Sequence, residues 1–192
     1  YGSAAGGVSF ADIICNGNGY KMVKEAVSGT TLVDDDYSSY VSRLKRINAE
    51  HADLFVCQLS TNDATCEKPL GSISDGKDMD SFDLHTISGA IEFIIAYVKE
   101  RWGCPVVFYT GTRYDSAVYA AMVELLKEIA LKWDTHVINL WEEASFNAAS
   151  KQDYERYMAD PIHPTLQGYL EWWSPFMEKA IKEILFPEID HD

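Results

Sequence analysis

Several features that would assign a sequence to a broad class of proteins are missing from this chain of 192 residues. Basic residues are few, because 16 Lys and Arg stand against 30 Asp and Glu, which gives a formal net charge of −14. This balance argues against nucleic-acid binding, since phosphate contacts require clustered Lys and Arg. No apolar run reaches the roughly 18 residues of a membrane-spanning helix. We therefore expect neither a nucleic-acid partner nor a membrane span.

Patterns for metal and nucleotide binding are also missing. The four cysteines form no C-x-x-C pair and no Cys/His cluster, so we expect neither a zinc site nor a disulfide framework. The loops contain no Gly-x-Gly-x-x-Gly segment and no Walker-type phosphate loop. A nucleotide-binding protein is therefore the least favoured of the classes considered.

Strand-like and helix-like stretches alternate along the chain. The expected strands span residues 21–27, 53–59, 105–109 and 135–140, and the expected helices span residues 8–15, 39–48, 83–102, 116–133, 141–149 and 166–185. The alternation predicts one α/β domain over residues 1–192, with a parallel sheet. Residues 60–81 are polar, and we expect them to form a long loop.

Polar motifs follow the expected strands at the points where these strands end. Ser28-Gly29 follows the first strand, residues 60–63 follow the second, and residues 110–112 follow the third. Ligands of parallel α/β sheets bind at the carboxyl ends of the strands. Another polar loop, at residues 160–163, precedes the last helix. We expect these four loops to converge on one edge of the sheet.

Asp160 and His163 are the best candidates for catalysis. An Asp three residues before a His can hold one imidazole nitrogen and leave the other to act as a base toward a serine or cysteine. The ordinary pKa of histidine, near 6.5, suits a general base at neutral pH. The alternative is a turn without chemistry, because Pro161 and Pro164 make this segment turn-prone.

Asn62 and Gly29 are the candidates for stabilising a developing oxyanion. The side-chain amide of Asn62 can donate a hydrogen bond, and Gly29 can offer an unobstructed backbone N–H. The alternatives are an Asn that satisfies nearby backbone and a glycine that only supplies a turn.

These blocks resemble those of the SGNH hydrolases, also called GDSL esterases and lipases. Residues 26–31 (Ala-Val-Ser-Gly-Thr-Thr) are similar to the family's Gly block, and residues 60–63 (Ser-Thr-Asn-Asp) to its Asn block. Residues 160–164 (Asp-Pro-Ile-His-Pro) are similar to its Asp/His block. The resemblance implies a flavodoxin-like three-layer α/β/α sandwich, a triad containing His163 and Asp160, an oxyanion hole containing Gly29 and Asn62, and no metal or organic cofactor.

The family's serine block reads roughly Gly-Asp-Ser-Ile-Thr-x-Gly and ends its first strand. Tyr1-Gly2 resembles the last two positions of that block, so the resemblance implies a nucleophilic serine just upstream of Tyr1. It also implies that the family's first, central strand is missing from residues 1–192, so that either a segment upstream of Tyr1 or another segment fills its place in the sheet. Ser3, Ser28 and Ser60 do not occupy the attacking position in this comparison.

The expected function is a serine esterase that hydrolyses carboxylic esters through an acyl-enzyme. The expected partner is a small-molecule ester with a short acyl or acetyl group, such as one carried by a carbohydrate. Aromatic residues that either flank the substrate or pack in the core are Tyr37, Tyr109, Tyr114, Trp141 and Trp172. The alternative is a noncatalytic binding domain that keeps the fold and lacks the nucleophile. The sequence decides neither the oligomeric state nor the localisation.

Overall fold

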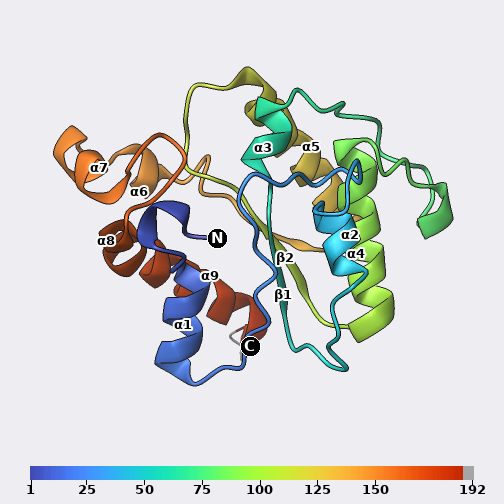
Figure 1. Cartoon of the computed structure of the whole chain (residues 1–192), viewed down its shortest axis with the longest axis horizontal. Helices are drawn as coiled ribbons and strands as arrows, with labels where there is room; N and C mark the ends of the chain where they lie inside the picture. The colour runs from blue at the N-terminus through green and yellow to red at the C-terminus, as the bar shows by residue number, and fades with distance from the viewer. Residues whose placement is uncertain (188–192) are drawn as a thin grey trace, which may run out of the picture. The chain divides into compact units, whose positions relative to one another are not determined.

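The computed structural model describes residues 1–187, and the chain forms two compact units. One unit is continuous and comprises residues 29–141. The other unit is made from both ends of the chain, residues 1–28 together with the residues from 142 onward. In Figure 1 the continuous unit runs from light blue to olive, and the discontinuous unit carries the blue and the orange-to-red segments.

The continuous unit is built on a parallel sheet of three strands in the order β1-β2-β3. Strand β1 is Phe55–Gln58, β2 is Val106–Tyr109 and β3 is His136–Ile138. Cys57 is paired with Phe108, and Phe108 with Val137. The three strands lie within three of the four segments predicted from the sequence, so the α/β fold with a parallel sheet is confirmed.

Two long helices connect the strands. Helix α4 (Ile87–Trp102) joins β1 to β2, and α5 (Ala117–Trp133) joins β2 to β3. Parallel connections are right-handed, so two successive crossovers in the same direction place both helices on one face of the sheet. The two helices pack against each other, as Figure 1 shows. Buried side chains of both helices form the core of this unit: Ile87, Ile91, Ile94, Ile95, Val98, Met122, Val123, Leu126 and Ile129.

Short elements complete the continuous unit. Helix α2 is Tyr40–Leu44, α3 is Thr61–Thr65, and a 3-10 helix, η2, spans Met79–Ser81. The predicted helix at residues 39–48 is therefore shorter than expected. The predicted loop at residues 60–81 is wrong at its start, where the hydroxyl of Ser60 accepts hydrogen bonds from the backbone of Asn62 and Asp63 and begins α3.

The discontinuous unit is mostly helical. Its elements are the 3-10 helix η1 (Ser3–Ala5), α1 (Phe10–Asn18), α6 (Ala144–Asn147), α7 (Lys151–Tyr157), α8 (Leu166–Gly168), the π-helix η3 (Tyr169–Trp173) and α9 (Ser174–Leu185). Helix α1 packs against α9 and η3, and the rings of Phe10 and Trp173 stack with centroids 6.5 Å apart. The helix predicted at residues 166–185 is thus divided into three segments by the π-helix.

The strand predicted at residues 21–27 is wrong, because this segment is irregular in the structure. The ammonium group of Lys24 turns back toward α1, where it donates to the carbonyl oxygen of Gly7 over 2.6 Å and pairs with Asp12. The segment follows α1, which continues past its predicted end at residue 15. Helix α1 ends only where Gly19 adopts the left-handed conformation, with φ of 69°.

Candidate active site

The loop that carries Asp160 and His163 closes on itself. Met158 and Pro164 form an isolated antiparallel bridge at its base. Inside the loop, the Oδ1 atom of Asp160 accepts hydrogen bonds from the backbone N–H groups of Ile162 and His163, each at 2.8 Å. The carboxylate therefore shapes the turn as well as facing the histidine ring. The alternative of a turn without chemistry agrees with this local conformation, but it does not explain why the Asp160 carboxylate also contacts the His163 ring.

The imidazole of His163 is held by the same carboxylate. Its Nδ1 atom lies 2.7 Å from Oδ2 of Asp160, and both side chains are about half exposed. With the proton on Nδ1, the ring donates to Asp160 and leaves Nε2 as the proton acceptor. Burial opposes ionisation of Asp160, but hydrogen bonds from Ile162 and His163 outweigh it and lower the pKa of this carboxyl. The pair thus has the geometry of a general base with its orienting carboxylate.

Asn62 lies at the start of α3, just beyond the carboxyl end of β1. Its Nδ2 atom donates to the carbonyl oxygen of Thr30 over 3.0 Å. The hydroxyl of Ser60 donates to the same carbonyl oxygen over 3.3 Å. A carboxamide carries two N–H groups, so the second remains to donate elsewhere. The structure therefore brings the predicted Asn block and the predicted Gly block together.

Gly29 directly precedes Thr30 and has a φ of 78°. This left-handed conformation strains any residue with a Cβ atom, which explains the glycine at this position. Gly29 is exposed, and a Cβ atom added to it would meet nothing within 4 Å. Conformation rather than crowding therefore requires the glycine, and its backbone remains sterically open.

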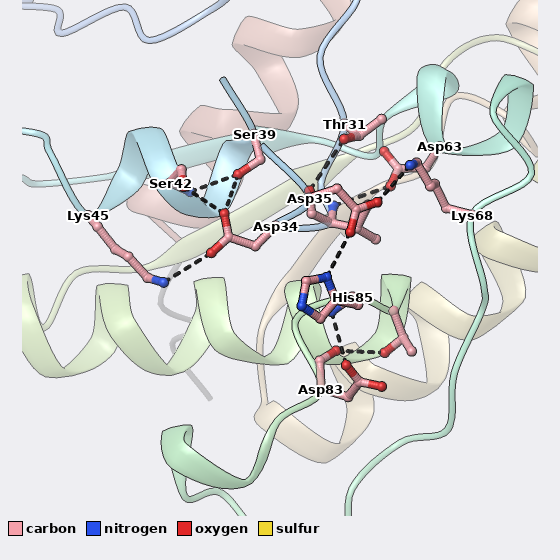
Figure 2. Close-up of polar contacts among 12 residues, drawn as sticks. Thr31, Asp34, Asp35, Ser39, Ser42, Lys45, Asp63, Lys68, Asp83 and His85 are labelled. Atoms are coloured by element: carbon pink, nitrogen blue, oxygen red, sulfur yellow. Dashed lines mark hydrogen bonds and ion pairs between the residues drawn. The ribbon is translucent and has the colours of Figure 1, made fainter. Parts of the chain in front are cut away.

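No role for Asp63 was predicted from the sequence, yet this residue is fully buried beside the Gly block. Its Oδ2 atom accepts from the backbone N–H of Leu32 at 2.7 Å, and its Oδ1 atom accepts from that of Val33 at 3.3 Å. Figure 2 shows this carboxylate against the loop that contains Thr31. Burial raises the pKa of Asp63, while the bonds from Leu32, Ser60 and Val33 act in the opposite direction.

A second group of charged residues lies around Asp34 and Asp35, in the loop that follows Gly29. Asp35 bonds Nζ of Lys68 through one oxygen and Nδ1 of His85 through the other, each at 2.7 Å. Its neighbour Asp34 accepts from the hydroxyls of Ser39 and Ser42 at 2.6 Å, as Figure 2 shows. The pairing of His85 could not be predicted from the sequence, because its partner lies 50 positions away in the chain.

The loop after β2 is tied to β1 by a buried tyrosine. The hydroxyl of Tyr119 accepts from the backbone N–H of Gly111 and donates to the carbonyl oxygen of Leu59, each at 2.9 Å. Residues 60–63 and 110–112 therefore both lie at the carboxyl edge of the sheet. Of the aromatic candidates, Trp141 is buried and Tyr37 is the most exposed.

The predicted site residues fall into two pairs. Asp160 and His163 contact each other in the discontinuous unit, whereas Asn62 contacts the residue that follows Gly29 in the continuous unit. Within residues 1–187, no group of three or more His, Cys, Asp or Glu side chains is arranged to hold a metal ion. No helix in this part of the chain is long and apolar enough to cross a membrane.

Residues 1–170 match the family model described as the GDSL-like lipase/acylhydrolase family. The chain belongs to this family. The match includes all four of the predicted site residues, Gly29, Asn62, Asp160 and His163. No curated protein is similar enough to this GDSL-family chain to count as a match.

Solved structures share the fold of this GDSL-like chain at low sequence identity. A protein from Lactobacillus plantarum is 18% identical, with a TM-score of 0.75, over 95% of this chain and 89% of that one. A candidate GDSL-like lipase from Bacteroides ovatus is 19% identical, with a TM-score of 0.67, over 91% and 78%. A candidate lipase from Chitinophaga pinensis is 11% identical, with a TM-score of 0.68, over 91% and 88%. These similarities support the SGNH-type fold.

Proposed function

We propose that this protein is a serine esterase that hydrolyses short-chain carboxylic esters through an acyl-enzyme. The single observation that carries the proposal is the contact between His163 and Asp160, with Nδ1 of the ring 2.7 Å from the carboxylate. Membership of a lipase/acylhydrolase family makes hydrolysis the expected reaction class for such a pair.

The proposed mechanism gives each residue one role. The Nε2 atom of His163 removes the proton from a serine hydroxyl as the serine oxygen attacks the ester carbonyl. Asp160 holds the ring and stabilises the imidazolium that forms. His163 then returns the proton to the leaving alcohol, and in the second half of the cycle it activates water to release the acid.

The negative charge that develops on the carbonyl oxygen requires hydrogen-bond donors. We assign this role to the backbone N–H of Gly29 and to the second N–H of the Asn62 side chain. The bond from Asn62 to Thr30, at 3.0 Å, supports the assignment because it fixes the plane of the amide before substrate arrives. Each such donor contributes roughly 2.7–4 kcal/mol to transition-state stabilisation.

We propose that the attacking serine belongs to the family's serine block and lies just upstream of Tyr1. We further propose a short acyl or acetyl group on a sugar or similar alcohol as the substrate. Half-buried Trp172, which stacks on Phe146 and Tyr157 with ring centroids 4.4 Å and 5.6 Å apart, supplies an aromatic surface in the same unit as His163. Such a surface suits a sugar ring.

Two measurements on the full-length protein test the proposal. The first is hydrolysis of 4-nitrophenyl acetate and of acetylated sugars. The second is labelling by a fluorophosphonate, followed by identification of the modified peptide. We expect turnover and one labelled serine just upstream of Tyr1. Absence of both turnover and labelling would favour the noncatalytic binding domain, and a label on Ser3, Ser28 or Ser60 would contradict the assigned nucleophile.

A further inference from the structure

We propose that Asp63 is a positioning residue that fixes the Gly29 loop against α3 and thereby sets the distance between the two oxyanion donors. This inference rests on the proposed esterase function for its catalytic consequence. Its structural part, the clamp on residues 30–33, stands on the contacts of Asp63 and Asn62 and needs no catalytic assumption.

The clamp begins with two buried backbone N–H groups. Leu32 and Val33 are both fully buried, so their N–H groups require acceptors inside the protein. Asp63 provides both acceptors, at 2.7 Å to Leu32 and 3.3 Å to Val33, and its own side chain is also fully buried. One side chain of α3 therefore holds two consecutive peptide groups of the loop.

The neighbouring residue Asn62 completes the clamp as a hydrogen-bond donor, whereas Asp63 is an acceptor. Its amide donates to the carbonyl oxygen of Thr30 at 3.0 Å, while Asp63 accepts from the N–H groups two and three residues further on. Three hydrogen bonds from two adjacent residues thus fix the loop from Thr30 to Val33. Gly29 is the residue directly before this fixed segment, so its N–H is positioned by the same contacts.

The substitution Asp63→Asn keeps the shape of the side chain but removes its negative charge and one of its two acceptor oxygens. The amide keeps one oxygen but replaces the other with an NH2 group, which cannot accept from a backbone N–H. One of the two loop N–H groups then faces a donor. We expect the loop to loosen while the rest of the fold is retained.

Glu92 offers a matched control in the same unit. It is also a fully buried carboxylate that accepts from a loop, at 2.9 Å from the backbone N–H of Ser74, and from Nε1 of Trp133 at 3.0 Å. Lys132 pairs with it as well. Glu92→Gln removes a buried charge from a hydrogen-bonded network, as Asp63→Asn does, but at a loop that contains no proposed oxyanion donor.

The test combines hydrogen–deuterium exchange with steady-state kinetics on the full-length protein and the two variants. In Asp63→Asn we expect amide exchange of residues 30–34 to rise at least about tenfold, and kcat on 4-nitrophenyl acetate to fall about 10- to 100-fold, with KM within about threefold. In Glu92→Gln we expect faster exchange near residues 72–76, and kcat within about twofold of the parent.

The outcomes separate the two proposals. Unchanged exchange at residues 30–34 in Asp63→Asn would overturn the clamp. Faster exchange with an unchanged kcat would overturn its catalytic role, as would an equal loss of kcat in Glu92→Gln, which would indicate general destabilisation. If the parent protein has no esterase activity, the proposed function fails. Exchange then still decides whether Asp63 holds the loop.

Discussion

The side-chain amide of Asn62 donates to the carbonyl oxygen of Thr30 over 3.0 Å, across 32 positions of sequence. This bond uses one of the two N–H groups of the amide and fixes the direction of the other. The alternative expected for Asn62, that its side chain satisfies nearby backbone, accounts for one of its two N–H groups. In the proposed mechanism, the same contact preorganises the amide as an oxyanion donor.

Asn62→Ala should lower kcat by about 10²–10³-fold with little change in KM, because the proposed bond strengthens only in the transition state. Steady-state kinetics on 4-nitrophenyl acetate measure both constants. Asn18→Ala is the control, since Asn18 bonds only the carbonyl oxygen of Ile14 and the side chain of Glu178 among the contacts described. A variant of Asn62 that raises KM alone would show that Asn62 binds the ground state.

His163→Ala should lower kcat by at least about 10³-fold, because the serine loses its base. His51→Ala is a matched control, since His51 also pairs with a nearby carboxylate, that of Asp53, at 2.9 Å on an exposed surface. This control should retain full activity. Circular dichroism of both variants checks that the fold is kept, and activity of His163→Ala within tenfold of the parent would refute the triad.

The Asp35–His85 pair predicts a measurable shift in histidine titration. The hydrogen bond that the His85 ring donates to the Asp35 carboxylate raises the pKa of His85 above its ordinary value of 6.5. The pKa of Asp35 is lowered in turn by its bonds to Lys68 and His85. NMR titration of the His85 ring should therefore show a raised pKa, and Asp35→Asn should bring it down toward 6.5. An unchanged pKa in the variant would contradict the pairing.

The sign of this shift also fixes how the pair affects stability. A raised histidine pKa stabilises the fold below the unfolded-state pKa, and this contribution is lost as the pH rises through the folded-state pKa. The parent should therefore melt above His85→Gln at about pH 5.5, and the difference should disappear by about pH 9. Because His85 is largely exposed, salt should reduce the difference at the lower pH.

Tyr119→Phe should lower the free energy of unfolding by about 1–3 kcal/mol, because Gly111 N–H and the carbonyl oxygen of Leu59 lose a buried partner. Urea unfolding measures the change. Tyr37→Phe is the control, since 75% of Tyr37 is exposed, and its effect should stay within about 0.5 kcal/mol. Equal stability of Tyr119→Phe and the parent would contradict the bridging role of this hydroxyl.

Elements with a strong internal pattern could be predicted from the sequence. Helix α4 carries isoleucines at helical spacing, and β2 is a short apolar run. The local residue pattern is therefore enough to predict a helix in one case and a buried strand in the other. Residues 21–27 lack such a pattern, since Lys24 and Glu25 interrupt the apolar positions. Such a segment forms a strand only if a neighbouring strand is available to pair with it. In this structure Lys24 pairs with Asp12 of α1 instead.

The same distinction applies to the site. Asp160 and His163 are three positions apart, so their contact follows from local geometry and could be predicted. The bond from Leu32 to Asp63 spans 31 positions, and a one-dimensional pattern does not contain the fold that joins them. Asp63 lies inside the predicted Asn block, but the positioning role proposed for it rests on its burial and its two backbone partners, which only the fold provides.

Asn18 also donates to Glu178, a residue 160 positions later. The unit that contains both is assembled from the two ends of the chain, whereas residues 29–141 form a unit without them. During synthesis at roughly 5–20 residues per second, α1 therefore leaves the ribosome roughly 10–30 seconds before α9 exists. Phe10 and Ile14, which are buried in the finished protein, have no α9 to pack against in that interval. The nascent chain consequently exposes the apolar face of α1 throughout that interval.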